Sequence, residues 1–247
     1  GDGFELPVRI TYPANFDPAK KYPLLASIYG GPNSAFVNDG YFSSYTGKAD
    51  ERELIGVQMD HRGSGHFGKA GQNYLHRDLG HWEIEDYSTV IKYLTQKYPF
   101  IDAERVGISG FSYGGYISAL ALVKAPELFK VGLAGGSVTD WHLYDSAYTE
   151  RYMESPKENP EGYKSSSVFT YVKNLKGHLS LAQGTMDDNV HMRNTMKLAD
   201  ALIEADKQFE VMFYPGAAHG WYYLPHKAKF YNNANDKFIK THLLQKP

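Results

Sequence analysis

The fold is decided by the stretch RVGISGFSYGGYISALAL, which runs from Arg105 to Leu122. It opens with a short apolar run that carries the β-branched residues Val106 and Ile108, which is typical of a buried strand. An alanine- and leucine-rich run follows and stops before Pro126, which is typical of a helix. Ser112 therefore lies on a tight turn between a strand and a helix.

Small residues surround this serine in the pattern Gly-x-Ser-x-Gly, from Gly110 to Gly114. Such a strand–turn–helix arrangement is the nucleophile elbow, in which the chain turns so sharply that only hydrogens fit beside the serine. The serine hydroxyl then projects above the sheet, and the first amides of the helix can face a developing anion. On the motif alone, a glycine-rich turn with an incidental serine stays open as the alternative.

The bulk properties exclude several classes of protein. The chain has 247 residues, enough for a large core, and a formal net charge of −2, which gives no reason to expect nucleic acid or an anionic membrane as partner. No window approaches twenty unbroken apolar residues, so we expect no membrane span. There is no cysteine, which excludes disulfides and thiol chemistry, and we expect neither a metal nor a cofactor. Aromatic residues reach 15%, which suggests an aromatic-lined pocket or simply the habit of a family.

Strand and helix patterns alternate along the rest of the chain, which predicts one α/β domain with a mostly parallel sheet and helices on both faces. The segment 155–176 is weakly patterned, and we expect it to lie outside the sheet. In "LGHWEIEDY" we interpret Asp86 as an early helical residue whose charge suits the helix dipole. The other expected strands are 4–12, 22–32, 53–60, 130–136, 178–184 and 209–215, and the other expected helices are 83–98, 191–207 and 226–244.

A serine nucleophile needs a base, and the base needs an acid that holds its tautomer. In this type of sheet the two partners follow the serine, acid first, on loops at the carboxyl ends of strands. The strand of "LSLAQGTMDDNV" runs into Asp187 and Asp188, and that of "VMFYPGAAHGW" runs into His219. We favour Asp187 because it comes first, whereas Asp188 could cap the next helix. A plain surface-loop role remains the alternative for His219.

An oxyanion hole needs a donor besides the amide of Tyr113. Many lipases and esterases supply it from an HGGG turn after an early strand, and the corresponding turn here is "YGGP", residues 29–32. The hydroxyl of Tyr29 could donate that hydrogen bond, which departs from the lipase pattern. Alternatively, Tyr29 is simply an aromatic residue at the end of a strand.

Long motifs in order and spacing make the sequence resemble the catalytic domains of the prolyl oligopeptidase family of serine peptidases, in their dipeptidyl peptidase IV-like branch. The motifs are "YGGP", "GFSYGGY", "WHLYDSAYTERYM", "GTMDDNVH" and the "HG" after the last strand. The resemblance runs from about Phe4 to Leu244. It implies an α/β-hydrolase fold and an exopeptidase that cleaves after proline, or less well alanine, near the amino terminus of a peptide.

The resemblance also implies a role for each matching residue. Ser112 is similar to the nucleophile, Asp187 to the triad acid and His219 to the base; Tyr29 and the Tyr113 amide correspond to the oxyanion donors. Asn189 matches a residue that binds a substrate carbonyl. The walls of the proline pocket match Tyr113, Val138, Trp141, Tyr144, Tyr148 and Val190. From the residues alone, the run 141–148 could instead pack segment 155–176 onto the sheet; Tyr144 and Tyr148 would face the same way on a helical turn.

The sequence also departs from the family pattern. Phe111 stands where tryptophan is more usual before the serine, and Met186 stands where alanine is common; both exchanges are apolar. Relatives carry an amino-terminal β-propeller that holds the free amino end of the substrate, and nothing in this sequence has the pattern of propeller blades. The chain opens on Gly1, so we expect a catalytic domain cut from a longer protein. The resemblance suggests a periplasmic or cell-surface location, and a homodimer through the closing helix.

Three functions are compatible with the sequence. The first is a serine exopeptidase domain that releases dipeptides or tripeptides. The second is an esterase or acylaminoacyl-type hydrolase on the same fold, against which Tyr29 and the pair Tyr144 and Tyr148 argue. The third is a fragment that is inactive without its propeller, or that serves only as a binding surface.

Overall fold

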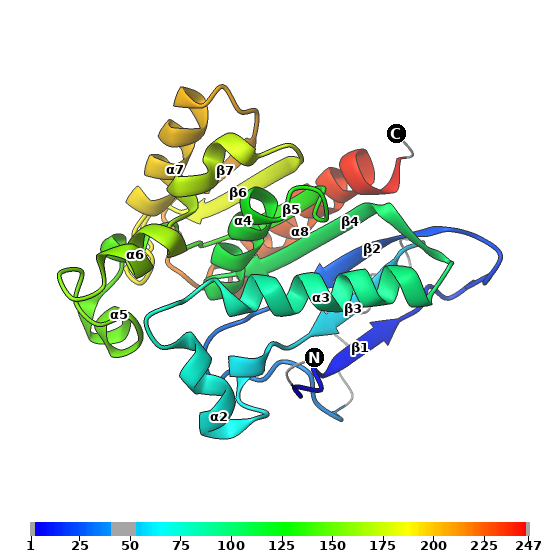
Figure 1. The fold of residues 1–247 in the computed structure, drawn as a ribbon. Coiled ribbons are helices and arrows are strands. Elements are labelled where there is room, and N and C mark those ends of the chain that lie inside the picture. The colour runs from blue at the N-terminus through cyan, green and yellow to red at the C-terminus, as the bar shows by residue number, and fades with distance from the viewer. Residues whose placement is uncertain (1–2, 41–52, 246–247) are drawn as a thin grey trace.

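The computed structural model describes residues 3–40 and 53–245. Its centre is a seven-stranded sheet in the order β1-β3-β2-β4-β5-β6-β7 (Figure 1). Only the edge strand β1 runs antiparallel to its neighbour, and the other five pairings are parallel. The expected α/β fold with a mostly parallel sheet is therefore confirmed.

The strands match the apolar runs of the sequence, although the expected edge strand 4–12 shortens to four half-buried residues. Apolar residues lie on both sides of it, but the ladder with β3 covers only Val8–Thr11. The strand bounds are β1 Val8–Thr11, β2 Tyr22–Ser27, β3 Ile55–Met59, β4 Ile101–Phe111, β5 Val131–Gly135, β6 His178–Gly184 and β7 Glu210–Tyr214.

In the described residues, helices lie between consecutive strands from β3 to β7, as crossover connections require. The described α-helices are α2 Gly68–Gln72, α3 Trp82–Lys97, α4 Tyr113–Lys124, α5 Ser146–Met153, α6 Pro160–Ser166, α7 Arg193–Glu204 and α8 Pro225–Ile239. Short 3-10 helices and one π-helical turn are also described: η1 Arg62–Ser64, η2 Asn73–Leu75, η3 Trp141–Leu143, η4 Val168–Asn174, η5 Trp221–Tyr223 and the π-helical turn η6 Lys240–Leu244.

The two faces of the sheet bury different partners. On β2, Leu24 packs in the main core with α3 and α4, whereas Leu25 faces the opposite side and packs with Phe238 of α8 and Leu243 of η6. This alternation is what a strand covered on both faces requires. In Figure 1, α3 and α4 accordingly lie in front of the sheet and α8 lies behind it.

Segment 155–176 lies outside the sheet, as expected, but it is helical rather than irregular. Asn159 caps α6 by accepting a hydrogen bond from the amide of Gly162, and Pro160 occupies the first helical turn. Val168 of η4 is fully buried in the main core. The helices are too short for a periodic pattern to reveal them, because each buries only two or three side chains.

Asp86 has a more specific role than the helix dipole that the sequence suggested. Its carboxylate accepts hydrogen bonds from the Arg62 guanidinium at 2.6 Å and from the Arg62 amide at 2.8 Å. Both side chains are about 95% buried, and the guanidinium lies 3.9 Å from the ring centre of Trp82. A charge this deeply buried is costly unless it is paired. The ion pair with Arg62, rather than the helix dipole, therefore explains why a carboxylate stands at position 86.

We predict that Asp86→Ala lowers the free energy of unfolding by about 3–5 kcal/mol, because it leaves the Arg62 guanidinium buried without its counter-charge. Urea unfolding measures the change. Lys176→Ala is the control, because Lys176 and Glu127 form an exposed ion pair, which contributes about 0–1 kcal/mol. Equal losses in the two variants would contradict the prediction.

Candidate active site

Ser112 lies on the sharp turn between β4 and α4 that its flanking glycines predicted. Its φ of 60° and ψ of −117° are strained for a residue with a side chain. A Cβ atom on Gly110 would lie 2.4 Å from the backbone of Gly114. One on Gly114 would lie 2.6 Å from the carbonyl oxygen of Ile28, and one on Gly115 would lie 2.4 Å from that of Gly135. The turn therefore closes only because hydrogens occupy these positions.

The predicted site residues come from the carboxyl ends of neighbouring parallel strands. Tyr29 follows β2, Ser112 follows β4, Trp141 follows β5, Asp187 follows β6 and His219 follows β7. Because these strands run in the same direction in adjacent positions, their ends meet at one edge of the sheet. The sheet thus gathers residues that lie up to 190 positions apart in sequence.

Ser112, His219 and Asp187 form a continuous chain of hydrogen bonds. His219 Nδ1 lies 2.7 Å from Asp187 Oδ2, and His219 Nε2 lies 2.9 Å from Ser112 Oγ. An ionised carboxylate only accepts hydrogen bonds, so the proton of a neutral imidazole belongs on Nδ1. Nε2 then presents its lone pair to the serine hydroxyl, as a general base requires.

The carboxylate of Asp187 is held from several sides. Oδ1 accepts hydrogen bonds from the amides of Val190 at 2.8 Å and Asn189 at 3.1 Å. The Gln183 side chain donates to Oδ2 at 3.1 Å. Asp187 is 3% exposed, and these donors satisfy the charge that burial would otherwise penalise. Asp188 is exposed, so the geometry selects Asp187 over Asp188 as the partner of His219.

Two contacts around these three residues could not be predicted from the sequence. Gln183 also donates to the carbonyl oxygen of Val190 at 3.1 Å, which ties the acid loop to β6. Its only sequence signal is a polar residue at the end of an apolar strand. Phe111 packs between His219, at 5.1 Å between ring centres, and Trp221, at 4.8 Å. Phe111, which stands where the family more often has tryptophan, therefore packs against the imidazole of His219.

The backbone of Tyr29 and the amide of Tyr113, the residues of the two expected oxyanion donors, lie at the turn. A Cβ atom on Gly114 would lie 3.2 Å from the Cα of Tyr29, so the backbone of Tyr29 touches the first turn of α4. Partial burial, and next the Tyr152 phenol, raise the pKa of Tyr29, so its hydroxyl keeps the proton that a donor needs. Tyr113 is the first residue of α4, where an amide has no acceptor within the helix.

The aromatic residues expected to wall a pocket form one cluster. Trp141 stacks on Tyr148 with ring centres 6.0 Å apart and contacts Tyr144 at 5.9 Å, and the two tyrosine rings meet edge to face at 5.4 Å. Tyr144 and Tyr148 are half-buried, while Val138, Trp141 and Val190 are buried. The expected shared helical turn is wrong, because Tyr144 precedes the N-cap Asp145 of α5 and only Tyr148 is helical.

Asn189 is exposed and joins the aromatic cluster through a hydrogen bond. The Tyr144 hydroxyl donates to Asn189 Oδ1 at 2.6 Å. Because the carboxamide oxygen is used in this way, the amide nitrogen Nδ2 is the end left for other acceptors. Met186, the other departure from the family pattern, is 69% exposed.

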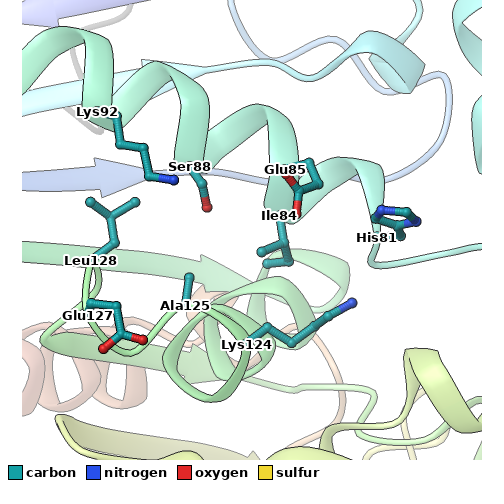
Figure 2. A pocket seen from close by; sticks show the side chains of 9 residues that line it. All are labelled: His81, Ile84, Glu85, Ser88, Lys92, Lys124, Ala125, Glu127 and Leu128. Atoms are coloured by element: carbon teal, nitrogen blue, oxygen red, sulfur yellow. The ribbon is translucent and has the colours of Figure 1, made fainter.

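A separate cavity of about 300 Å³ lies between α3 and the carboxyl end of α4 (Figure 2). Its lining includes Lys124, the last residue of α4, whose pKa burial lowers. Ser112 adjoins the first residue of the same helix, and twelve helical residues span about 18 Å. This cavity is therefore distinct from the group of residues around Ser112.

We predict that Asp187→Asn slows phosphonylation of Ser112 by a fluorophosphonate at least about 10²-fold, because an amide nitrogen facing His219 favours the wrong tautomer. Asp188→Asn is the matched control and should leave the rate unchanged, since Asp188 is an exposed neighbour. Active-site labelling followed by intact-protein mass spectrometry gives both rates. A slow Asp188→Asn variant beside a fast Asp187→Asn variant would reverse the assignment.

Comparison with known proteins agrees with this geometry. A dipeptidyl peptidase 4 from the venom of Vespa velutina is 40% identical over 234 residues, which cover 91% of this chain but 30% of the relative. The crystal structure of Porphyromonas gingivalis dipeptidyl peptidase 4 superimposes with a TM-score of 0.94 at 36% identity, over 97% of this chain and 34% of that one. The expected α/β-hydrolase fold is thereby confirmed.

The chain thus spans about a third of the length of these relatives. Within residues 3–40 and 53–245, no helix combines the length and apolar character that crossing a membrane requires. Residues 41–245 match the family described as the prolyl oligopeptidase family. The resemblance seen in the sequence is confirmed: this chain belongs to the prolyl oligopeptidase family.

Proposed function

We propose that this chain is the catalytic domain of a serine exopeptidase that releases dipeptides or tripeptides by cleaving after proline, or less well alanine. The observation that carries the proposal is the hydrogen-bonded chain from Ser112 through His219 to Asp187, with distances of 2.9 and 2.7 Å. The names of the relatives, which are dipeptidyl peptidases, support the same reaction.

In the proposed acylation step, Ser112 Oγ attacks the carbonyl carbon that follows the proline ring, and His219 Nε2 takes the hydroxyl proton. The resulting imidazolium is stabilised by the carboxylate of Asp187. When the tetrahedral intermediate collapses, His219 gives that proton to the leaving amine, and the peptide remainder departs. Water then attacks the acyl-enzyme with the same histidine as base, which restores the serine.

The negative charge on the carbonyl oxygen needs donors during both steps. We assign this role to the Tyr29 hydroxyl and to the Tyr113 amide. The raised pKa of Tyr29 supports a protonated donor at neutral pH. The position of Tyr113 at the start of α4 adds the partial positive charge of a helix amino end.

The aromatic cluster is suited to a proline side chain. A rigid pyrrolidine ring loses little conformational freedom on binding and packs well on aromatic faces. We propose that Asn189 Nδ2, which the Tyr144 hydroxyl leaves available by bonding Oδ1, donates to a carbonyl of the substrate backbone. The walls of this proposed pocket are Tyr113, Val138, Trp141, Tyr144, Tyr148 and Val190.

In this proposal, another part of the natural protein recognises the free amino end of the substrate. The chain spans about 30% of its venom relative, and the family resemblance points to an amino-terminal β-propeller that would anchor the free amine. We also propose a homodimer. Exposed apolar residues on the edge strand β7 and on α8, such as Met212 and Phe230 at 40% and 55% exposure, support it.

An esterase or acylaminoacyl-type hydrolase is the rival reaction. The same three residues would serve it, but Tyr29 in place of the HGGG turn of many lipases, and the clustered Tyr144 and Tyr148, argue against it. Comparison of glycyl-prolyl-nitroanilide with a p-nitrophenyl ester separates the two. We expect the full-length protein to prefer the prolyl amide, and hydrolysis of the ester alone would favour the rival.

The same assay on the isolated domain shows whether residues 1–247 are sufficient for cleavage. An active domain would mean that residues 1–247 hold the complete site, while an inactive domain beside an active full-length protein would place substrate anchoring elsewhere. In either case Ser112 should still react with a fluorophosphonate, because that reaction needs no anchored amine. Absence of labelling in the full-length protein would contradict the proposed nucleophile.

We predict that Tyr29→Phe lowers kcat about 10²–10³-fold with little change in KM, because the lost hydrogen bond forms fully only in the transition state. Steady-state hydrolysis of glycyl-prolyl-nitroanilide by the full-length protein measures both constants. Tyr93→Phe is the control, since Tyr93 is an exposed tyrosine on α3. A raised KM with an unchanged kcat would instead make Tyr29 a ground-state binding residue.

A further inference from the structure

Glu83 is a buried carboxylate for which the proposed reaction has no use. It lies in the first turn of α3, and its exposed fraction is 0%. Its Oε1 accepts a hydrogen bond from the Tyr113 hydroxyl at 2.6 Å, and its Oε2 accepts one from the Gly80 amide at 3.0 Å. Burying a carboxylate is costly, so a residue of this kind calls for a reason to be there.

Tyr113 connects this carboxylate to the proposed oxyanion site. It directly follows Ser112, and its own amide is one of the two proposed donors. Its side chain is 4% exposed and packs against Trp141 at 5.5 Å and Tyr29 at 6.4 Å between ring centres. Because the ring is held at its far end by Glu83, the Cα and the amide of the same residue have little freedom to tilt.

The loop that precedes Glu83 is itself fixed to α4. The Tyr116 hydroxyl donates to the carbonyl oxygen of Leu79 at 3.2 Å and to that of Ser166 at 2.8 Å. Gly80 has a φ of 83°, and a Cβ atom on it would lie 2.2 Å from the Tyr116 hydroxyl. Glu83 is thus part of a rigid support under the first turn of α4 rather than an isolated side chain.

We propose that Glu83 is a positioning residue that holds Tyr113, and through it the oxyanion-binding amide, in the geometry that the transition state requires. The inference rests on the proposed role of the Tyr113 amide. The short hydrogen bond from phenol to carboxylate is of the charge-assisted kind, which is stronger than a bond between neutral groups.

The arrangement favours a carboxylate. The Gly80 amide can only donate and the Tyr113 hydroxyl donates to Oε1, so a carboxylate offers an acceptor to each of them. In Glu83→Gln, Oε1 can still accept from the Gly80 amide, but Nε2 then faces the Tyr113 hydroxyl, so the short bond to a carboxylate is replaced by a reversed bond between neutral groups. The size and packing of the side chain at position 83 stay the same, and only its hydrogen bonds to Tyr113 and Gly80 change.

The test compares Glu83→Gln, Tyr113→Phe and the double variant in the full-length protein. With glycyl-prolyl-nitroanilide we expect each to lower kcat about tenfold with KM unchanged, less than the ~10²–10³-fold that a missing donor costs. The double variant should be no slower than the slower single variant, because both remove the same contact.

Inhibitors report the oxyanion geometry directly. A prolyl boronic acid forms a tetrahedral adduct with the serine, so its affinity should fall in parallel with kcat in Glu83→Gln. Glycyl-pyrrolidide fills the same pocket but has no carbonyl or carboxylate at the position of the attacked carbon, so its affinity should stay unchanged. A parallel loss of both affinities would make Glu83 a pocket residue and overturn the inference.

Tyr22→Phe is the matched control for Tyr113→Phe. Tyr22 is 4% exposed, and its hydroxyl accepts a partly buried hydrogen bond from the amide of Asp17. It begins β2 at the opposite end of the strand from Tyr29. It should lower the melting temperature and leave kcat unchanged. An equal fall of kcat in Tyr22→Phe would assign the effect to general destabilisation and overturn the inference.

Phosphonylation of Ser112 by a fluorophosphonate separates the inference from the proposed function. If the protein is labelled but cleaves no prolyl substrate, the proposed function fails, and slower labelling of Glu83→Gln still supports the positioning role. If prolyl substrates are cleaved and Glu83→Gln matches the parent in kcat and labelling rate, the function stands and the inference is overturned. Absence of labelling in the parent would overturn both.

Discussion

The close approach of α4 to the sheet is the constraint on which the remaining structure depends. Gly110, Gly114 and Gly115 leave no room for a Cβ atom, because backbone atoms of the turn, of β2 and of β5 occupy that space. This contact forces Ser112 into its positive φ and points its hydroxyl at the edge where the loops of β6 and β7 also end. The strain of that turn is borne by a well-packed core, since residues throughout α4 are buried.

Periodicity and motif order predicted the elements that the sheet depends on, but not the contacts between distant residues. The strands and the long helices were recognisable because each buries a regular set of apolar side chains. By contrast, the hydrogen bond of Glu83 with Tyr113 joins residues 30 positions apart. The pairing of Arg62 with Asp86 likewise joins η1 to α3. Charged residues in amphipathic patterns look solvated, and only tertiary structure reveals that these are buried.

For the candidate site as well, the sequence predicted some features and only the structure revealed others. Glycines around Ser112 and small residues around His219 predicted the tight turn and the position of the base, because chain segments can approach each other closely only at such residues. The sequence favoured Asp187 over Asp188 only because it comes first after the strand. The structure adds the direction of each side chain, since Asp187 faces His219 and Asp188 is exposed. The wrong expectation for Tyr144 and Tyr148 has a local cause: Asp145 caps α5 by accepting from the Tyr148 amide, so the chain turns between the two rings.

The central claim is that Ser112 becomes acylated by the residues that precede the scissile bond. The most direct measurement is to quench the full-length protein during turnover of a glycyl-prolyl ester and to map the added mass by peptide mass spectrometry. We expect a glycyl-prolyl adduct on the peptide that contains Ser112, lost when the serine is replaced by alanine. An adduct on another residue, or turnover that persists in Ser112→Ala, would contradict the claim.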